Sequence, residues 1–226
     1  MFIEHLVLNT PEPAAMRTFF RDTLGLSTQL PDAEFLEAQA GATRLVFRKG
    51  PPDWEGIYHF AFNIPENRFQ DARQWLKARV PLLPGSDGGE VFHFEAWNAH
   101  AVYFNDPAGN ILEFIARHDL NNASEAPFHS GQILNISEIG LVTGDVPHLV
   151  ESLQLMAGVA VYRPGTELFA PVGDENGLFI VVKTGRDWFV GTGRPATMVP
   201  LEVEFRNSEG VRFRIAAPDY VAALTG

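Results

Sequence analysis

The fold of this chain is decided by the stretch Tyr103-Phe104-Asn105-Asp106-Pro107-Ala108-Gly109-Asn110-Ile111-Leu112-Glu113, which predicts a strand, a tight turn and a second strand. Asp106, Pro107 and Gly109 stand at positions i, i+1 and i+3 of a type I turn, where each residue type is favoured. The apolar runs on either side can pair as a hairpin. This hairpin would place the carboxylate of Glu113 in an apolar strand, where a charge is costly unless it is paired or bound to a metal.

Composition limits the class of protein. The 226 residues are enough for one large domain or two modest ones. The formal net charge of −11 argues against nucleic acid and anionic membranes as partners, because both require a basic surface. The absence of cysteine excludes disulfides, thiolate metal sites and a cysteine nucleophile. No signal segment and no run of membrane-spanning length is evident, so we expect a soluble, cytoplasmic protein.

The first 118 residues contain two copies of one unit. Residues 4–12 align without a gap with residues 58–66, and the two segments share His, Asn, Pro and Glu at four positions. Self-similarity at this spacing indicates a duplicated structural unit. Each unit is predicted to be a strand, a helix and then two or three strands, with the later strands of the two copies at residues 35–39, 44–48, 91–97, 99–105 and 111–116.

A third copy follows a polar, aperiodic segment at residues 119–132, which we interpret as a linker. Residues 5–25 map without a gap onto residues 138–158. A fourth copy is truncated, because its two expected strands have no helical pattern between them. The later strands of these two copies are expected at residues 159–162, 167–171, 177–183, 200–206 and 211–215.

His5, His59 and Glu113 are the candidate metal ligands. The two histidines occupy equivalent positions on equivalent strands, so both imidazoles would face one cavity if the first two copies pair about a pseudo-twofold axis. Glu113 comes from the last strand of the second copy. Two imidazoles and one carboxylate suit a divalent first-row ion, Fe(II) or Mn(II) most naturally, and Zn(II) or Ni(II) would also bind. A lone histidine in an apolar strand is more often a core residue, but the matched repeat positions favour a metal.

The first copy offers no fourth ligand. Aligning Gly41 with Gly109 puts Leu45 opposite Glu113. Three protein ligands leave room for substrate and water, which is typical of a catalytic rather than a structural site. We therefore expect a metal-binding domain at residues 1–118. A second domain at residues 133–226 would be metal-free, because it keeps Glu138 at the His5-equivalent position but shows no second or third ligand.

The repeated unit, the two histidines and the Tyr-x-x-Asp-Pro-x-Gly-x-x-x-Glu run ending at Glu113 resemble the vicinal oxygen chelate superfamily. That superfamily includes glyoxalase I, extradiol ring-cleavage dioxygenases, fosfomycin-resistance thiol transferases and methylmalonyl-CoA epimerase. The resemblance implies an α+β fold of tandem βαβββ modules, paired into a cupped mixed sheet around one metal, with a second, partly truncated module pair. It also implies a metal that chelates vicinal oxygens of the substrate and stabilises the charge that develops there.

Two further residues match the ring-cleavage enzymes. Tyr103 stands where those enzymes carry an active-site tyrosine, and their pattern has a histidine a few residues upstream. His93 is the nearest match, although its spacing to Tyr103 is about one residue too long. Alternation over residues 92–97 groups His93 with Glu95 and Trp97 on one face, from which His93 could assist proton transfer; a solvated edge strand is the alternative.

Three functions compete on this sequence. The first is an extradiol dioxygenase-like oxidoreductase that uses Fe(II) and O2 on a catechol-like or other vicinal-oxygen small molecule. The second is a thiol transferase or lyase of the same architecture, in which Mn(II) or Zn(II) activates an epoxide or carbonyl. The third is a non-enzymatic protein that sequesters a small aromatic molecule, as bleomycin-resistance proteins do. The truncated fourth copy leaves a sheet edge that a second subunit could cover, so a homodimer is also expected.

Overall fold

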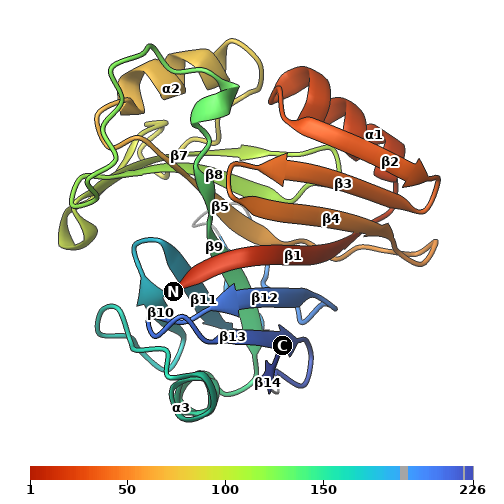
Figure 1. Cartoon of the computed structure of the whole chain (residues 1–226), viewed down its shortest axis with the longest axis vertical. Helices are drawn as coiled ribbons and strands as arrows, with labels where there is room; N and C mark the ends of the chain where they lie inside the picture. The colour runs from red at the N-terminus through yellow and green to blue at the C-terminus, as the bar shows by residue number, and fades with distance from the viewer. Residues whose placement is uncertain (189–192, 221, 226) are drawn as a thin grey trace.

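The computed structural model describes residues 1–188, 193–220 and 222–225 as two seven-stranded mixed sheets (Figure 1). The first sheet has the strand order β14 (Ala223–Leu224), β13 (Arg212–Ala216), β12 (Glu202–Arg206), β1 (Phe2–Thr10), β4 (Thr43–Lys49), β3 (Phe35–Ala40) and β2 (Ser27–Asp32). The second sheet has the order β10 (Phe169–Asp174), β11 (Gly177–Lys183), β9 (Asn135–Thr143), β5 (His59–Ile64), β8 (Ile111–Arg117), β7 (Ala99–Asn105) and β6 (Phe92–Phe94).

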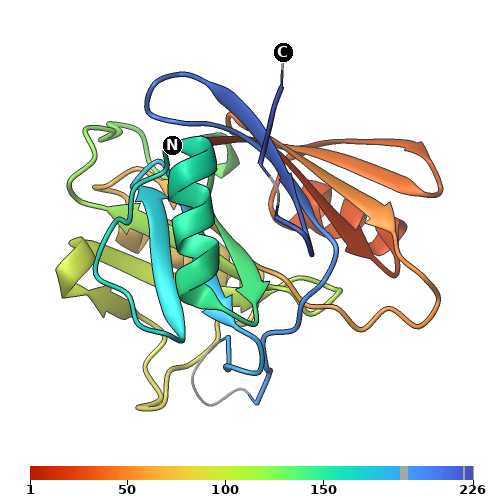
Figure 2. The same cartoon turned by 90° about the horizontal axis from the view of Figure 1, so that it is seen from below.

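Each of the first three modules has its helix after its first strand, which confirms the predicted α+β fold of βαβββ modules. The helices are α1 (Pro13–Thr18), which continues as a π-helical turn at Phe19–Thr23, α2 (Phe69–Lys77) and α3 (Val146–Ala157). Figure 2 shows α3 lying alongside β10 and β11. Among the described residues, no helix is long and apolar enough to cross a membrane.

The modules pair differently from the way we expected. In the first sheet β1 of the first module lies antiparallel to β12 of the truncated fourth module, and in the second sheet β5 of the second module lies antiparallel to β9 of the third. Each sheet therefore combines strands from before and after residues 119–132. The expected pairing of the first two modules in one sheet was wrong, while the domain boundaries at 118 and 133 stay a prediction.

The segment at residues 119–132 contains no strand, as expected of a connection, but it packs against the second module. The Arg68 side chain donates two hydrogen bonds to the carbonyl of Ser124, at 2.8 and 2.6 Å, and the backbone N–H of Glu66 donates to Asn122 at 2.8 Å. The segment ends in a 3-10 turn at Ser130–Gln132. These contacts direct the chain from β8 to β9, which then lies beside β5.

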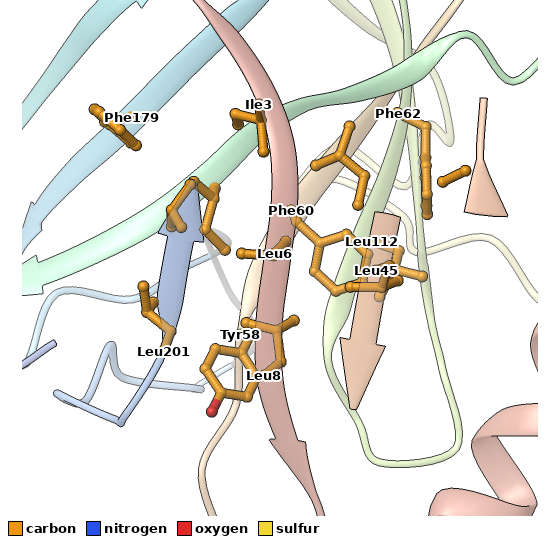
Figure 3. Close-up of a cluster of buried hydrophobic side chains, with 14 of the residues drawn as sticks. Ile3, Leu6, Leu8, Leu45, Tyr58, Phe60, Phe62, Leu112, Phe179 and Leu201 are labelled. Atoms are coloured by element: carbon orange, nitrogen blue, oxygen red, sulfur yellow. The ribbon is translucent and has the colours of Figure 1, made fainter. Parts of the chain in front are cut away.

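A shared apolar core lies between the two sheets. Alternation along each strand sends every second side chain into it. Leu6 and Leu8 of β1 and Phe60 and Phe62 of β5 are fully buried there. Figure 3 shows these side chains in one cluster with others from both halves of the chain, namely Ile3, Leu45, Tyr58, Leu112, Phe179 and Leu201. The intervening positions, which include His59, face the opposite side of each sheet.

The turn that connects β7 to β8 has the hydrogen bonds that its sequence predicts. The backbone N–H of Gly109 donates to the carbonyl of Asp106 at 3.0 Å, and Gly109 has a φ of +83°. The Asp106 carboxylate accepts hydrogen bonds from the backbone of Ala108 and from both the backbone and the side chain of Asn110. Asn110 in turn accepts from the backbone N–H of Tyr58 at 2.9 Å. The turn therefore fixes the start of β5, where His59 lies.

Candidate metal centre

Three buried ionisable side chains converge on the second sheet. His59 is the first residue of β5, and Glu113 and Glu138 lie in the neighbouring strands β8 and β9. His59 Nε2 lies 3.7 Å from Glu113 Oε2 and 3.8 Å from Glu138 Oε2. The three potential ligand atoms all lie within 4.8 Å of one another. This spacing allows the three atoms to share one cation.

The imidazole of His59 is oriented by the backbone. The sheet register places Ile111 opposite His59, and His59 Nδ1 lies 3.0 Å from the Ile111 carbonyl oxygen. A carbonyl accepts but cannot donate, so Nδ1 carries the proton. Nε2 is therefore the nitrogen that faces the two carboxylates, and it is the nitrogen through which a histidine held in this way would bind a metal.

Glu113 is 1% exposed, and its Oε1 has no hydrogen-bond partner among the described residues. Burial and the neighbouring Glu138 raise the pKa of Glu113 well above its usual range, against the opposing influence of Arg117 and of a hydrogen bond from Tyr103. The unpartnered Glu113 oxygen lies beside a second carboxylate and an imidazole, in a group that is short of positive charge when both glutamates are ionised. A divalent cation would supply that charge, so the residues present fit a metal.

Arg117 neutralises one of the two carboxylates. It ends β8, is fully buried, and donates a hydrogen bond through Nη2 to Glu138 Oε1. Its guanidinium carbon lies 5.5 Å from the centre of the Trp97 ring. The other oxygen of Glu138, Oε2, faces His59. Glu138 therefore lies between the Arg117 guanidinium and the other two candidate ligands. With Glu113 ionised, as it would be when bound to a metal, the four side chains would carry one excess negative charge, which favours a cation.

The position of a fourth ligand is apolar. Strands β9 and β11 repeat the geometry of β5 and β8, because Glu138 pairs with Leu178 as His59 pairs with Ile111. By this register Ile180 takes the place in the third module that Glu113 takes in the second. Three protein ligands remain, and the other coordination positions of a metal would be open to substrate and water.

A cavity of about 520 Å³ lies over the three candidate ligands. This volume is within the range of small-molecule sites. The second and third modules both contribute to its lining, which is mostly aromatic: Phe92, Phe94, Trp97, Tyr103, Phe169 and Trp188, with Gly85, Ser86, Ile180 and Arg186. A small, flat, largely apolar molecule with a few polar atoms is the ligand that such a cavity suits.

Trp188 is a cavity residue that the sequence did not reveal. Its ring centre lies 5.8 Å from that of His59. Gly140, on β9 two residues after Glu138, makes this possible, because a Cβ at that position would overlap Cη2 and Cζ3 of the Trp188 ring. The third module therefore supplies both a candidate ligand and part of the cavity wall.

Comparison with known proteins identifies the fold. No protein-family model matches the chain, and no curated protein matches its sequence. A solved structure from Bacillus subtilis, described as a "putative dioxygenase", matches 98% of this chain and 88% of its own with 15% identity and a TM-score of 0.61. Glyoxalase I from Zea mays matches 98% of this chain and 90% of its own with 13% identity and a TM-score of 0.52. The chain has the vicinal oxygen chelate fold.

Within this vicinal oxygen chelate fold, the structure separates His5 from the other two predicted ligands. His5 lies on β1 in the first sheet, where its Nδ1 is 3.7 Å from Glu204 Oε2. The prediction that His5, His59 and Glu113 converge was therefore wrong, because it required the first two modules to pair. Glu138, at the equivalent position of the third module, lies beside His59 instead.

The expected register of the first module was wrong by one residue. His5 pairs with Arg44 on β4 as His59 pairs with Ile111 on β8, so Val46 and not Leu45 is the counterpart of Glu113. Leu45 is fully buried in the shared core. Both residues are apolar, so the first module offers no carboxylate at this position with either register.

Tyr103 lines the cavity, and its ring centre lies 6.1 Å from that of His59. His93 does not line it. Phe92 and Phe94 face the cavity, whereas His93 is exposed and stacks on His100 with ring centres 4.4 Å apart. The expected alternation over residues 92–97 holds only within β6, because Glu95–Trp97 form a 3-10 turn. Phe92 and Phe94 were expected to pack under a helix but line the cavity, and Trp97, which was grouped with His93, lines it as well.

Glu138 and Arg117 were missed as site residues. The signal for Glu138 was present, since it is a lone carboxylate in an apolar strand at the position equivalent to His5 and His59. Arg117 gave no periodic or motif signal at the end of its strand. Residues 133–226 were expected to form a metal-free domain, and this stays a prediction, but they contribute Glu138 to the candidate site and Ile180 and Trp188 to the cavity.

Proposed function

We propose that this protein is a metal-dependent enzyme of the extradiol ring-cleavage type, acting on a small catechol-like molecule. The observation that carries the proposal is the convergence of His59 Nε2, Glu113 and Glu138 beneath an aromatic cavity, with an unpartnered oxygen on Glu113. One imidazole and two carboxylates, in place of the expected two imidazoles and one carboxylate, would hold Mn(II) or Fe(II), with Zn(II) and Ni(II) as alternatives. When bound, the metal supplies Lewis acidity and the redox chemistry with O2.

The chain's own residues bind and orient the substrate. The aromatic walls hold a flat ring and exclude water, and Trp188 beside His59 limits the space above the candidate ligands. Burial and the nearby Glu113 raise the pKa of Tyr103 well above its usual value, so the hydroxyl stays protonated at neutral pH. Tyr103 therefore does not act as a base; its hydroxyl, which is hydrogen-bonded to Glu113, would donate to a substrate oxygen once Glu113 binds a metal.

The test is oxygen consumption by iron-loaded protein with catechol. We expect O2 uptake and a yellow ring-fission product, both reduced at least about a hundredfold in Glu113→Gln because one of the three candidate metal ligands is lost. Glu202→Gln is the matched control, since it changes a glutamate of the other sheet that binds Arg48 and Arg214, and it should retain activity. Iron-loaded protein that consumes no O2 with catechol-like compounds would contradict the oxidoreductase assignment.

A transferase or lyase reaction is the second candidate. It is favoured by the presence of two carboxylates at the site, because one of them, Glu113, has an oxygen without a hydrogen-bond partner among the described residues and a raised pKa suited to proton transfer. Activity with Mn(II) or Zn(II) in the absence of oxygen, on an epoxide or carbonyl substrate, would support this candidate over the first.

Three broader expectations stay predictions. A sequestering protein would bind an aromatic ligand equally well after His59→Ala, whereas an enzyme of the proposed type would not. A homodimer would be detected by sedimentation at micromolar concentration. A cytoplasmic location is expected from the sequence, and the net charge of −11 predicts that nucleic acids and anionic membranes are not partners.

A further inference from the structure

We propose that the cavity selects aromatic compounds with an anionic group on the side of the ring away from the candidate metal ligands, and that Arg186 binds this group. The inference rests on the proposed function and names the substrate class for the same site. Arg186 is the one lysine or arginine among the described residues that line the cavity. Nothing in the metal chemistry requires a cation there, so its placement indicates specificity.

The surroundings of Arg186 leave its charge available. Its guanidinium carbon lies 5.2 Å from the centre of the Phe169 ring, and Nη1 donates to the backbone carbonyl of Asp187 at 3.2 Å. Contact with an aromatic face positions a guanidinium while leaving its edge free for a planar anion. A carboxylate or similar planar acidic group is therefore the partner that this geometry suits.

Sheet register gives a rough distance along β11 between the level of the candidate ligands and the level of Phe169, over which Arg186 lies. Ile180 marks the level of the ligands on β11, because it is the counterpart of Glu113. Phe169, which carries Arg186 on its face, pairs with Val182, two residues farther along β11. Two residues of a strand cover roughly 7 Å. This is about the length of one aromatic ring with a substituent, so the anionic group should lie across the ring from the oxygens that a metal would bind.

Charge complementarity supports the same class. The chain has a formal net charge of −11, which alone would repel an anionic ligand. The floor of the cavity also carries Glu113 and Glu138. A cation in the lining lowers the cost of bringing an anion into this environment. An uncharged catechol would gain no binding energy from Arg186. The residue therefore distinguishes anionic aromatic ligands from uncharged ones.

The test compares two probes in protein loaded with Mn(II) in the absence of oxygen. The probes are catechol and protocatechuate, which is catechol with a carboxylate across the ring from one hydroxyl. Tryptophan fluorescence should show that protocatechuate binds about two- to fivefold more tightly, as expected for one partly exposed ion pair. The isomer with the carboxylate beside the hydroxyls should show no such gain.

Variants identify the residue responsible. Arg186→Gln should bring the ratio of the two affinities to about one, and Arg186→Lys should restore part of the preference. Arg163→Gln is the matched control, because Arg163 also lies over an aromatic ring, that of Tyr162 at 4.8 Å, but does not line the cavity. Equal affinities for the two probes, or a preference that survives Arg186→Gln, would overturn the inference.

Failure of the proposed function gives a different result. If the protein binds no Mn(II), or if Glu113→Gln leaves the affinity for catechol unchanged, the metal site itself is wrong. If Mn(II) and catechol bind as expected but the carboxylate adds nothing, the metal site stands and the role of Arg186 is refuted.

Discussion

The two sheets carry the same first-strand histidine in two different environments. In the second sheet the side chain of His59 is 9% exposed, and its Nε2 faces two carboxylates. In the first sheet the side chain of His5 is 23% exposed, its Nδ1 lies 3.7 Å from Glu204 Oε2, and burial lowers its pKa. The position equivalent to Glu113 is Val46. A repeated sequence position therefore becomes a candidate ligand in one sheet and a partly exposed neighbour of a single glutamate in the other.

The residue opposite each histidine accounts for part of this difference. In the second sheet the register places Gly140 opposite His59, and the space above it is taken by Trp188. In the first sheet Glu204 stands opposite His5 and contacts it directly. The glycine leaves space for an aromatic side chain to cover the imidazole of His59. The glutamate instead contacts the imidazole of His5 directly.

The second glutamate of each sheet shows the effect of burial. Glu138 is buried and bound by the buried Arg117. Its counterpart by register, Glu202, is bound by Arg48 and Arg214 at a partly exposed surface. The first arrangement leaves one carboxylate oxygen toward a cavity, and the second uses both oxygens in ion pairs. The comparison shows that a site needs a buried, incompletely satisfied set of charges and not merely the same residue types.

The largest expected effect is on stability, from Arg117→Met compared with Arg48→Met. Removing the buried guanidinium leaves Glu138 as an uncompensated buried charge, which should lower the free energy of unfolding by about 3–5 kcal/mol. Arg48 belongs to an exposed ion pair, and its loss should cost less than about 1 kcal/mol. Urea denaturation of both variants measures the difference. Equal losses of unfolding free energy in the two variants would contradict the difference in burial between the Arg117–Glu138 and Arg48–Glu202 pairs.

The next effect is on metal affinity. His59→Ala should weaken Mn(II) binding by at least about a hundredfold, because it removes a candidate ligand. Loss of a residue that only hydrogen-bonds to a ligand typically costs about 10- to 100-fold. His5→Ala should leave Mn(II) binding unchanged, since His5 lies in the other sheet. Isothermal titration calorimetry of both variants is the measurement. A loss of affinity in His5→Ala would restore the triad that the sequence suggested.

Gly140→Ala should have a smaller effect. The added Cβ overlaps the Trp188 ring, so the ring must move, at a cost of about 1–3 kcal/mol. The displacement should also change the fluorescence of Trp188 and its quenching by catechol. Glu204→Ala at the equivalent position of the first sheet should cost less than about 1 kcal/mol, because it removes only a partly exposed pair. Thermal unfolding and emission spectra test both variants.

The smallest expected effect is on the pH dependence of the free energy of unfolding of the metal-free protein, to which Glu113 and Glu202 should contribute with opposite signs. Burial raises the folded-state pKa of Glu113, so the stability linked to its protonation is present below its unfolded pKa and is lost as the pH rises through the folded value. Stability should fall by up to about 1.4 kcal/mol per pH unit in that window, and Glu113→Gln should remove this slope.

Glu202 should behave with the opposite sign. Partial burial would raise its pKa, but hydrogen bonds from Arg214 and Arg48 outweigh burial and lower it. Its contribution is therefore present above the unfolded pKa and lost as the pH falls through the folded pKa. Urea unfolding in the presence of a chelator, at a series of pH values, distinguishes the two glutamates. Slopes of the same sign for both would contradict the contrast.

Local sequence predicted the elements that local interactions build. The Asp106–Gly109 turn and the bounds of β7 and β11 follow from neighbours in the chain, and the structure contains them. His59, Glu113 and Tyr103 were identified for the same reason, because one module places all three. The partner of this module was not predictable in this way, since it depends on contacts between residues far apart in sequence.

The sequence by itself determined that modules repeat, that each begins with a strand able to carry a ligand, and that Glu113 needs a compensating charge. Tertiary structure decided which two first strands meet. The packed segment at residues 119–132 brings β9 beside β5, so Glu138 and not His5 completes the cluster. The physical reason is that strand pairing between modules is set by backbone hydrogen bonds and by the path of the connection, and neither leaves a periodic pattern in the sequence.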